Sequence, residues 1–401
     1  MKAVDVHYKE EYIIYSIVLL LGVGFCYLSL PHANQPTFLF YSGSLILSML
    51  CIYYSELSKN RFVSILFLLV GLAILGFPMA FRLPIAVDDE NYMHLFYRAK
   101  EFGFKAYLRT SDQEKGYLAL NWIIYRFVDG DYNYFVTAIT YLTFFLWLVA
   151  FKTMGNQKGS GMFMALFLWS HFYFFVLNSG LIRLFMALPI TFIGIQHVWK
   201  GNWKWFTFWV VLAAFIHMSS LVMLLFLLFF IKQKFFYKHW GVFVILTIFV
   251  VFISFISMAN FLIPILGDRY EGYGEIDELS FSAGSFTSLP IWLVCYYYFK
   301  NLPTVSDDYR KKYIVGMILL SLSIIFPVAA SMVHIGRVIF YAYLGMMVVI
   351  SAIFQIRTRN ATDMIVKCML IVYALVYVMS TNMLNDRKTQ LFPYQSFLWD
   401  E

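Results

Sequence analysis

Long runs of apolar residues, separated by short polar stretches, dominate the chain from one end to the other. Most runs approach the roughly 20 residues that a helix needs to cross a bilayer. In lipid, apolar stretches of this length satisfy their own backbone hydrogen bonds as helices. The pattern therefore predicts an all-α polytopic integral membrane protein, with spans at 12–30, 37–54, 62–81, 134–151, 161–177, 180–199, 242–265, 285–299, 313–331, 335–355 and 364–384.

The composition supports this prediction and excludes a soluble fold. Hydrophobic residues make up 61% of the 401 residues and charged residues 13%, against about 45–50% and about 25% in soluble domains. The net charge of +7 is explained by basic cytoplasmic loops, so we expect no nucleic-acid partner. We interpret residues 1–401 as a single transmembrane domain.

Basic residues gather in every second loop, which orients the spans. Short loops rich in lysine and arginine stay in the cytoplasm. With the N-terminus inside, the loops at 59–61, 152–158 and 200–204 lie in the cytoplasm. The outer loop 82–133 and the acidic outer loop 267–284 then lie on the opposite face, where we predict that they cover an active site.

One apolar run, residues 206–231, carries His217, Ser219 and Ser220 at its centre and lysines on both sides. If it crossed the membrane once, every later basic loop would fall outside, against the charge rule. We therefore predict a re-entrant hairpin with His217 at its tip, which brings the total to about 11–13 membrane helices. Polar backbone at that depth is tolerated only when it is buried in protein or lines a wet cavity. One long tilted helix is the alternative.

Ionisable residues collect on the outer face in this topology. An ionisable residue inside a span is costly and is a functional candidate by default, although a lone arginine near a span end can also serve as an interfacial anchor. Several arginines in an apolar cavity suit a multivalent anion, because guanidinium forks bind phosphate oxygens in pairs. A histidine or carboxylate beside them can accept a proton from a hydroxyl. The sequence has no HExxH, cysteine cluster, GxGxxG or P-loop, so we expect neither a metal nor a cofactor.

Four stretches resemble, in order, the motifs of the EpsG-like branch of Wzy-type polysaccharide polymerases. They are VDDENYMHLF with Asp88 and Tyr92, EKGYLALNWIIYRF with Glu114, Gly116, Tyr117 and Asn121, GLIRLFMALPI with Arg183 and Ala187, and AAFIHMSSLV with His217 and Ser219. Arg337 with Tyr341 resembles the final family motif more weakly. Lys115 departs from the family pattern, in which we expect proline.

The resemblance implies a membrane-embedded glycosyltransferase of GT-C-like architecture. Such enzymes polymerise oligosaccharide repeats linked to undecaprenyl pyrophosphate on the outer face of the bacterial inner membrane, for O-antigen, capsule or exopolysaccharide. Lipid-linked oligosaccharides are both donor and acceptor, and a chain-length regulator and a flippase are the implied partners. The donor's lipid pyrophosphate is the leaving group, and a sugar hydroxyl of the acceptor attacks.

We assign roles on this basis. The predicted catalytic residues are His217 as the base, Arg183 and Arg337 as the arginines that neutralise the leaving pyrophosphate, and Glu114. The predicted substrate contacts are Asp88, Asp89, Tyr92, Tyr117, Asn121, Arg82, Arg269, Tyr270, His334 and Tyr341.

Other functions remain open at this point. An O-antigen ligase shares the same donor chemistry but transfers the glycan to a lipid core. A flippase or transporter of lipid-linked oligosaccharide favours paired internal repeats, which the sequence does not show. A membrane acyltransferase also favours an arginine and a histidine, but it needs an acyl donor from the cytoplasmic side.

Overall fold

Helices make up most of the described part of the chain. The computed structural model describes residues 2–154, 160–231, 233–239, 241–242, 289–300, 307–321, 323, 337, 339–356, 358, 360–383 and 392–398. Six helices in these ranges contain segments long and apolar enough to cross a membrane: α1 (Lys2–Ser29), α2 (Gln35–Leu57), α3 (Arg61–Ala80), α7 (Tyr132–Thr153), α10 (Ile182–Trp199) and α20 (Ala361–Val378). The predicted all-α, multi-pass membrane fold is confirmed.

Further predicted spans coincide with shorter helices. The span predicted at 161–177 consists of α8 (Ser160–Leu168), the π-helical turn η2 (Trp169–Tyr173) and α9 (Phe174–Ser179). The later helices α16 (Leu289–Lys300), α17 (Asp307–Ser321) and α19 (Ile339–Gln355) fall on three more. The span predicted at 242–265 lies outside the described residues apart from Val242, as does the whole acidic loop 267–284. The total of about 11–13 membrane helices therefore stays a prediction.

Polar side chains start several of the long helices. The side chain of Asn60 accepts hydrogen bonds from the amides of Phe62 and Val63 at the start of α3. Asp131 caps α7, and Asn360 caps α20, in the same manner. Each of these caps satisfies amides that have no partner inside the helix. Short polar connections thus fix where the apolar runs begin.

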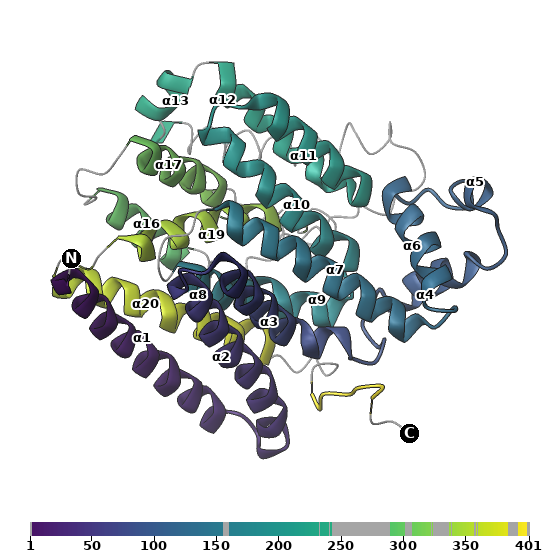
Figure 1. Ribbon diagram of the computed structural model, residues 1–401, viewed down its shortest axis with the longest axis horizontal. Coiled ribbons are helices and arrows are strands. Elements are labelled where there is room, and N and C mark those ends of the chain that lie inside the picture. Colours follow the sequence, from purple (N-terminus) through teal and green to yellow (C-terminus); the bar gives the residue numbers. More distant parts are fainter. Residues whose placement is uncertain are drawn as a thin grey trace, which may run out of the picture. The chain divides into compact units, whose positions relative to one another are not determined.

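The predicted outer loop 82–133 contains helices of its own. They are α4 (Asp89–Arg98), α5 (Phe104–Tyr107) and α6 (Lys115–Phe127), which we call the cap (Figure 1). Apolar and polar side chains alternate with helical period in α6, and its buried face presents Tyr117, Leu118, Asn121 and Ile124. The cap is therefore a folded layer, and its side chains have fixed positions.

The chain reverses direction at His217, as predicted. Helix α11 (Trp203–Ile216) ends there, and the return segment consists of the 3₁₀ helix η3 (Met218–Leu227) and α12 (Leu228–Ile231). The ring of Phe206, near the start of α11, lies 5.7 Å from the ring of Phe230. On one straight helix these two residues would be about 36 Å apart. The single long helix is therefore excluded, while the position of the hairpin in a membrane stays a prediction.

The chain forms two compact units. The first comprises Met1–Ile190, Leu212–Met218 and Phe354–Glu401, and the second comprises Thr191–Val211 and Ser219–Ile353. In the first unit α2 packs against α3 and α8, α3 also packs against α7, and α1 packs against α20 (Figure 1). In the second unit α16 packs against α17.

The basic loops of the first unit lie at one end of its helices. Lys152 donates a hydrogen bond to the Ser64 hydroxyl at 2.8 Å. Near the start of α1, the buried side chain of Glu11 accepts from the Thr358 hydroxyl at 2.8 Å, and the Lys367 ammonium lies 3.9 Å from the same carboxylate. The loops rich in lysine and arginine, which orient a membrane protein, therefore share one end of this unit.

A short C-terminal segment covers the other end. We call residues 392–398 the strap. The Tyr394 amide donates a hydrogen bond to the Thr37 hydroxyl at 3.1 Å, and the Tyr394 hydroxyl donates to the Pro78 carbonyl at 3.0 Å. The Ser396 hydroxyl donates to the Phe81 carbonyl at 2.6 Å. The strap thus lies where α2 begins and α3 ends, opposite the basic loops.

In the second unit two glycines bring helices together. A Cβ atom on Gly345 of α19 would lie 2.3 Å from the Leu319 Cβ of α17, and one on Gly316 would lie 3.1 Å from the Gly345 carbonyl oxygen. Small residues at such crossings let the backbones of membrane helices approach closely. The helices α17 and α19 therefore depend on glycine at their point of closest contact.

Candidate active site

Five side chains meet in the first unit, where the cap adjoins the start of α10 and the end of α11. They are Tyr92, Gln113, Glu114, Arg183 and His217, and we call them the Glu114 cluster. Three of the four residues predicted to be catalytic are among them, although they come from three separate motifs. The structure brings these predicted residues together, and their roles stay predictions.

Glu114 lies at the N-cap of α6, and its two carboxylate oxygens face different partners. Oε2 accepts a hydrogen bond from Nη1 of Arg183. Oε1 accepts from the backbone amide of Met218 at 3.0 Å and lies 3.3 Å from Nδ1 of His217. The contact with His217 lacks the alignment of a hydrogen bond, although such contacts can tighten in a reacting complex. The carboxylate therefore bridges the arginine and the turn at His217.

Arg183 is the second residue of α10, and polar and aromatic groups surround its guanidinium. Nη1 also donates to Oε1 of Gln113, and Nε donates to the Tyr92 hydroxyl at 3.3 Å. The guanidinium carbon lies 5.4 Å from the ring centre of Tyr92 and 5.6 Å from that of Tyr117. Both rings attract the cation through their π faces. Arg183 is therefore held in one orientation from several sides.

The environment of Glu114 keeps its carboxylate ionised. Burial by itself raises the pKa of Glu114. The contact with His217, the positive charge of Arg183 and the Met218 amide outweigh burial and lower the pKa from 4.5 to about 2. At neutral pH the carboxylate and the guanidinium therefore form a compact pair of opposite charges.

Gly116 explains how α6 comes so close to the end of α11. A Cβ atom at this position would lie 2.6 Å from the carbonyl oxygen of Phe215. No larger residue fits without separating the two segments. Glu114 and His217 each lie two residues from this contact, so the close approach sets the distance between them.

Two further predicted substrate contacts lie on the buried face of α6. Tyr117 and Asn121 are one helical turn apart and fully buried, and the Tyr117 ring packs 5.7 Å from that of Tyr92. Neither the Tyr117 hydroxyl nor the Asn121 amide has a well-aligned hydrogen-bond partner among the described residues. Buried polar groups normally bond to protein or to ordered water. These two side chains therefore add polarity next to the Glu114 cluster.

Arg82 and Asp89, both predicted substrate contacts, bind each other. Nη1 of Arg82 donates to Oδ2 of Asp89, and Nη2 donates to Oδ1 at 2.8 Å. The Ala86 amide also donates to the carboxylate at 2.8 Å, which closes the turn before α4. The side chains are 7% and 1% exposed. In this bidentate pair each side chain neutralises the charge of the other. A substrate role for either residue stays a prediction.

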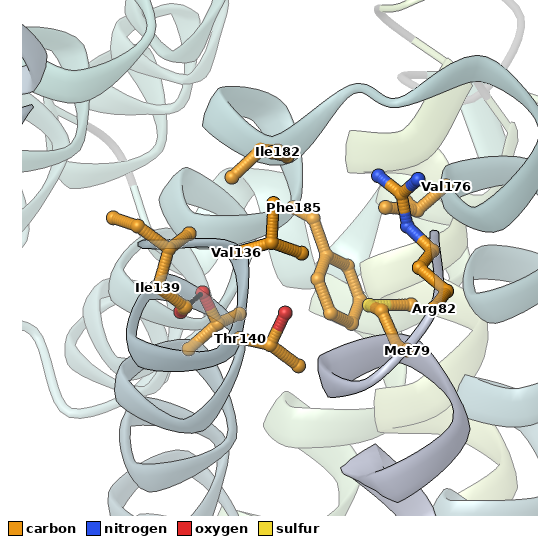
Figure 2. Close-up of a pocket in the computed structure, with 9 residues that line it drawn as sticks. Met79, Arg82, Val136, Ile139, Thr140, Val176, Ile182 and Phe185 are labelled. Carbon is orange, nitrogen blue, oxygen red and sulfur yellow. Dashed lines mark hydrogen bonds between the residues drawn. The ribbon is translucent and has the colours of Figure 1, made fainter. Parts of the chain in front are cut away.

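The space beside Arg82 is small and apolar. Figure 2 shows Arg82 with residues of α3, α7, α9 and α10 around a cavity of about 10 Å³. That volume is about enough for one water molecule. Its walls include Met79, Val136 and Phe185. Arg82 therefore faces no space of the size of a sugar here.

The turn at Gly180 brings the start of the VDDENYMHLF motif next to the start of α10. Its φ of +73° is in the left-handed region, which favours glycine. A Cβ atom on Gly180 would lie 3.3 Å from the amides of Asp88 and Asp89. The Asp88 amide donates to the Ser179 carbonyl at 3.0 Å. Asp88 is thereby held near this turn, and its predicted contact with substrate stays a prediction.

The remaining predicted residues do not belong to the first unit. Tyr341 and Arg337 belong to the second unit, where the Tyr341 hydroxyl lies 3.0 Å from that of Ser219 and 2.8 Å from that of Ser220. Arg269, Tyr270 and His334 lie outside the described residues. The predicted roles of all five stay predictions.

Sequence reasoning missed two groups that contact Arg183 or Glu114, the Gln113 side chain and the Met218 amide. Gln113 precedes Glu114 directly, and its side chain shares Nη1 of Arg183 with that carboxylate. The Met218 amide follows His217 and cannot be recognised from residue type. The only available signal was the pair of neighbouring polar residues before α6.

The described residues contain no group of three or more His, Cys, Asp or Glu side chains placed to hold a metal ion. A guanidinium such as that of Arg183 is a group that can bind an anion, and an imidazole such as that of His217 is a group that can accept a proton. The predicted independence of metals stays a prediction.

Comparison with known proteins gives one match. A protein-family model described as the EpsG family matches residues 65–396. This range contains the whole Glu114 cluster, the cap and the hairpin. No curated protein and no solved structure matches the chain.

Proposed function

The chain belongs to the EpsG family, and from this membership we propose that it polymerises oligosaccharide repeats linked to undecaprenyl pyrophosphate by glycosyl transfer. The family gives the chain the general role of a glycosyltransferase-like polysaccharide polymerase in a membrane. The observation that carries the finer proposal is the Glu114 cluster, in which an arginine and a histidine lie on either side of one carboxylate.

Arg183 is the proposed contact for the donor's diphosphate. A guanidinium presents paired N–H groups that match phosphate oxygens. Negative charge grows on the diphosphate as its bond to the sugar breaks, so a fixed cation there lowers the barrier. The rings of Tyr92 and Tyr117 hold the cation in place without neutralising it. Arg337 remains a proposed second arginine for the same anion.

His217 is the proposed base for the acceptor. Its neutral imidazole can accept the proton of a sugar hydroxyl through Nε2 while Nδ1 faces Glu114. A carboxylate on the far side of an imidazole orients the ring and stabilises its charged form. The acceptor oxygen then bonds to the anomeric carbon, and lipid diphosphate leaves with the electron pair of the broken bond.

The proposed side of the membrane follows from the first unit. The cap and the Glu114 cluster lie at the ends of α3, α7 and α10 that are opposite the loops of Lys59 and Lys152. Basic loops favour the cytoplasm. The cluster therefore opens toward the outer face of the bacterial inner membrane, where lipid-linked repeats meet.

Replacing Arg183 by lysine tests the donor contact. The charge stays and the paired donors are lost, so we expect polymer formation to fall about 100-fold. The measurement is the length distribution of polymer in cells with matched levels of membrane-inserted protein. Arg98→Lys in α4 is the control, because Arg98 packs over Phe102, away from the cluster. Full-length polymer from the Arg183→Lys variant would contradict the donor contact.

Replacing His217 by glutamine tests the base. We expect no polymer, while lipid-linked single repeats still accumulate and can be transferred onward. Normal polymer in this strain would remove His217 from the mechanism. If the wild-type protein, supplied with lipid-linked repeats, transfers single units to a lipid core without elongating them, the protein is a ligase.

A further inference from the structure

The guanidinium of Arg183 is already occupied by side chains of the protein. Its Nη1 donates to Glu114 and to Gln113. The side chains of Arg183 and Glu114 are 10% and 14% exposed, so little solvent screens the pair. A diphosphate that binds this arginine through Nη1 must take the place of at least one of those two oxygens.

Glu114 also opposes a diphosphate by its charge. Its carboxylate binds Nη1, so a phosphate oxygen bound at that nitrogen would lie next to the carboxylate. Two anions that share one cation in a buried site repel each other strongly. The diphosphate and the Glu114 carboxylate therefore compete for Arg183.

Glu114 has a second set of partners that remains when Arg183 is lost. Oε1 still faces the Met218 amide at 3.0 Å and Nδ1 of His217 at 3.3 Å. A carboxylate released by the arginine is left with the histidine turn as its nearest source of positive charge. Its full charge then acts on the imidazole.

On this basis, and resting on the proposed function, we propose that Glu114 is an exchangeable internal anion: donor diphosphate displaces it from Arg183, and the released carboxylate then strengthens His217 as the base. The first event neutralises the leaving group, and the second prepares the attacking hydroxyl. A single side chain thus links donor binding to activation of the acceptor.

The transfer step balances with these groups. The acceptor hydroxyl gives its proton to Nε2 of His217, and its oxygen bonds to the anomeric carbon of the donor. The bond from that carbon to the diphosphate oxygen breaks, and its electron pair leaves with the lipid diphosphate. Glu114 stabilises the imidazolium until the proton passes to water. Departure of the diphosphate lets Glu114 return to Arg183.

Two variants with opposite charge changes test the exchange. Glu114→Gln removes the competing charge and should bind farnesyl diphosphate, a probe without sugar, about tenfold more tightly than the wild type. The same variant should polymerise about 100-fold more slowly, because the imidazole loses its carboxylate. Gln113→Glu adds a competing charge at Nη1 and should bind the probe about tenfold more weakly. Tighter binding with slower turnover separates this exchange from a purely structural role.

Controls keep the outcomes distinct. Glu101→Gln removes an exposed carboxylate in the turn between α4 and α5 and should change neither measurement. If the wild type binds the probe through Arg183 but Glu114→Gln binds it equally or more weakly, the exchange is wrong and the proposed donor contact stands. If Arg183→Lys binds the probe as well as the wild type, the donor contact itself is wrong. Should Glu114→Gln fail to fold, unchanged binding by Gln113→Glu would overturn the exchange.

Discussion

Two arginine–carboxylate pairs lie at the same end of the first unit and differ in what surrounds them. In the Arg82–Asp89 pair both carboxylate oxygens bind the guanidinium, and the Ala86 amide completes the set. In the Arg183–Glu114 pair only one oxygen binds the guanidinium, and the other faces His217 and Met218. The first pair closes on itself, whereas the second connects to further groups.

The difference gives a criterion for separating a structural ion pair from one that we propose to take part in the reaction. Charge and burial are similar in both pairs, so neither property distinguishes them. What distinguishes them is whether the carboxylate has a second partner that can change its protonation or its bonding. Of the two carboxylates, Glu114 has such a partner in His217. The neutral partners of Arg183 are the side chains of Tyr92 and Gln113, whereas the neutral partner of Arg82 is the backbone carbonyl of Leu83.

Removing one partner of the Arg82–Asp89 pair should destabilise the protein most. Asp89→Leu leaves the Arg82 charge buried without its partner, and we expect a loss of about 3–5 kcal/mol in stability. The double variant Arg82→Leu with Asp89→Leu removes both charges and should recover most of that loss. Thermal unfolding of the purified protein in detergent measures both variants.

The corresponding double variant of the Arg183–Glu114 pair shows whether the two pairs differ in function. Arg183→Leu with Glu114→Leu should give a folded protein that makes no polymer, because we propose that this pair takes part in the transfer step. If the Arg82 and Asp89 double variant were equally inactive at full stability, the two pairs would not differ in the way described.

Ionised Glu114 should contribute about 3 kcal/mol to the free energy of unfolding, and acid should remove this contribution. Its pKa in the folded protein is about 2, below its ordinary 4.5. The stabilisation is therefore complete above about pH 4.5 and is lost as the pH falls toward 2. The unfolding temperature of the wild type should drop across this window more steeply than that of Glu114→Gln. Equal slopes would show that Glu114 titrates normally.

The smallest effect is expected from Gly116→Ala. The new methyl group meets the Phe215 carbonyl at 2.6 Å, which should cost about 1–3 kcal/mol through overpacking. It also moves Glu114 away from His217, so polymer formation should fall by more than the stability loss explains. Gly103→Ala is the control, because no atom lies within 4 Å of its Cβ position. Equal activity of the two variants would argue against the spacing set by Gly116.

The pattern of apolar residues was sufficient to predict where the long helices lie. The predicted spans at 37–54, 62–81 and 134–151 lie within α2, α3 and α7 apart from one residue at the end of α3. The charge rule also predicted the reversal at His217, because only a hairpin keeps the later basic loops on one side. These features depend on local composition, which a single sequence displays directly.

The side-chain contacts of the candidate site could not be predicted from the sequence and became visible only in the structure. Nothing near Arg82 in the sequence shows that it binds Asp89 while Arg183 binds a residue 69 positions before it. The short helices of the cap were also missed, because their apolar runs are too brief to stand out. Such pairings depend on how the helices pack, and packing brings together residues that have no common signal in the sequence.

The strap has a consequence for how the protein is made. Arg82 and Asp89 lie close together in the chain, but the bridge from Arg82 to Ser396 joins residues more than three hundred positions apart. At about 5–20 residues per second, the ribosome reaches Ser396 tens of seconds after it has passed Arg82. During that interval the strap does not yet cover the start of α2 and the end of α3. A nascent chain arrested before the strap would insert these helices but leave the Arg82–Asp89 pair open to water.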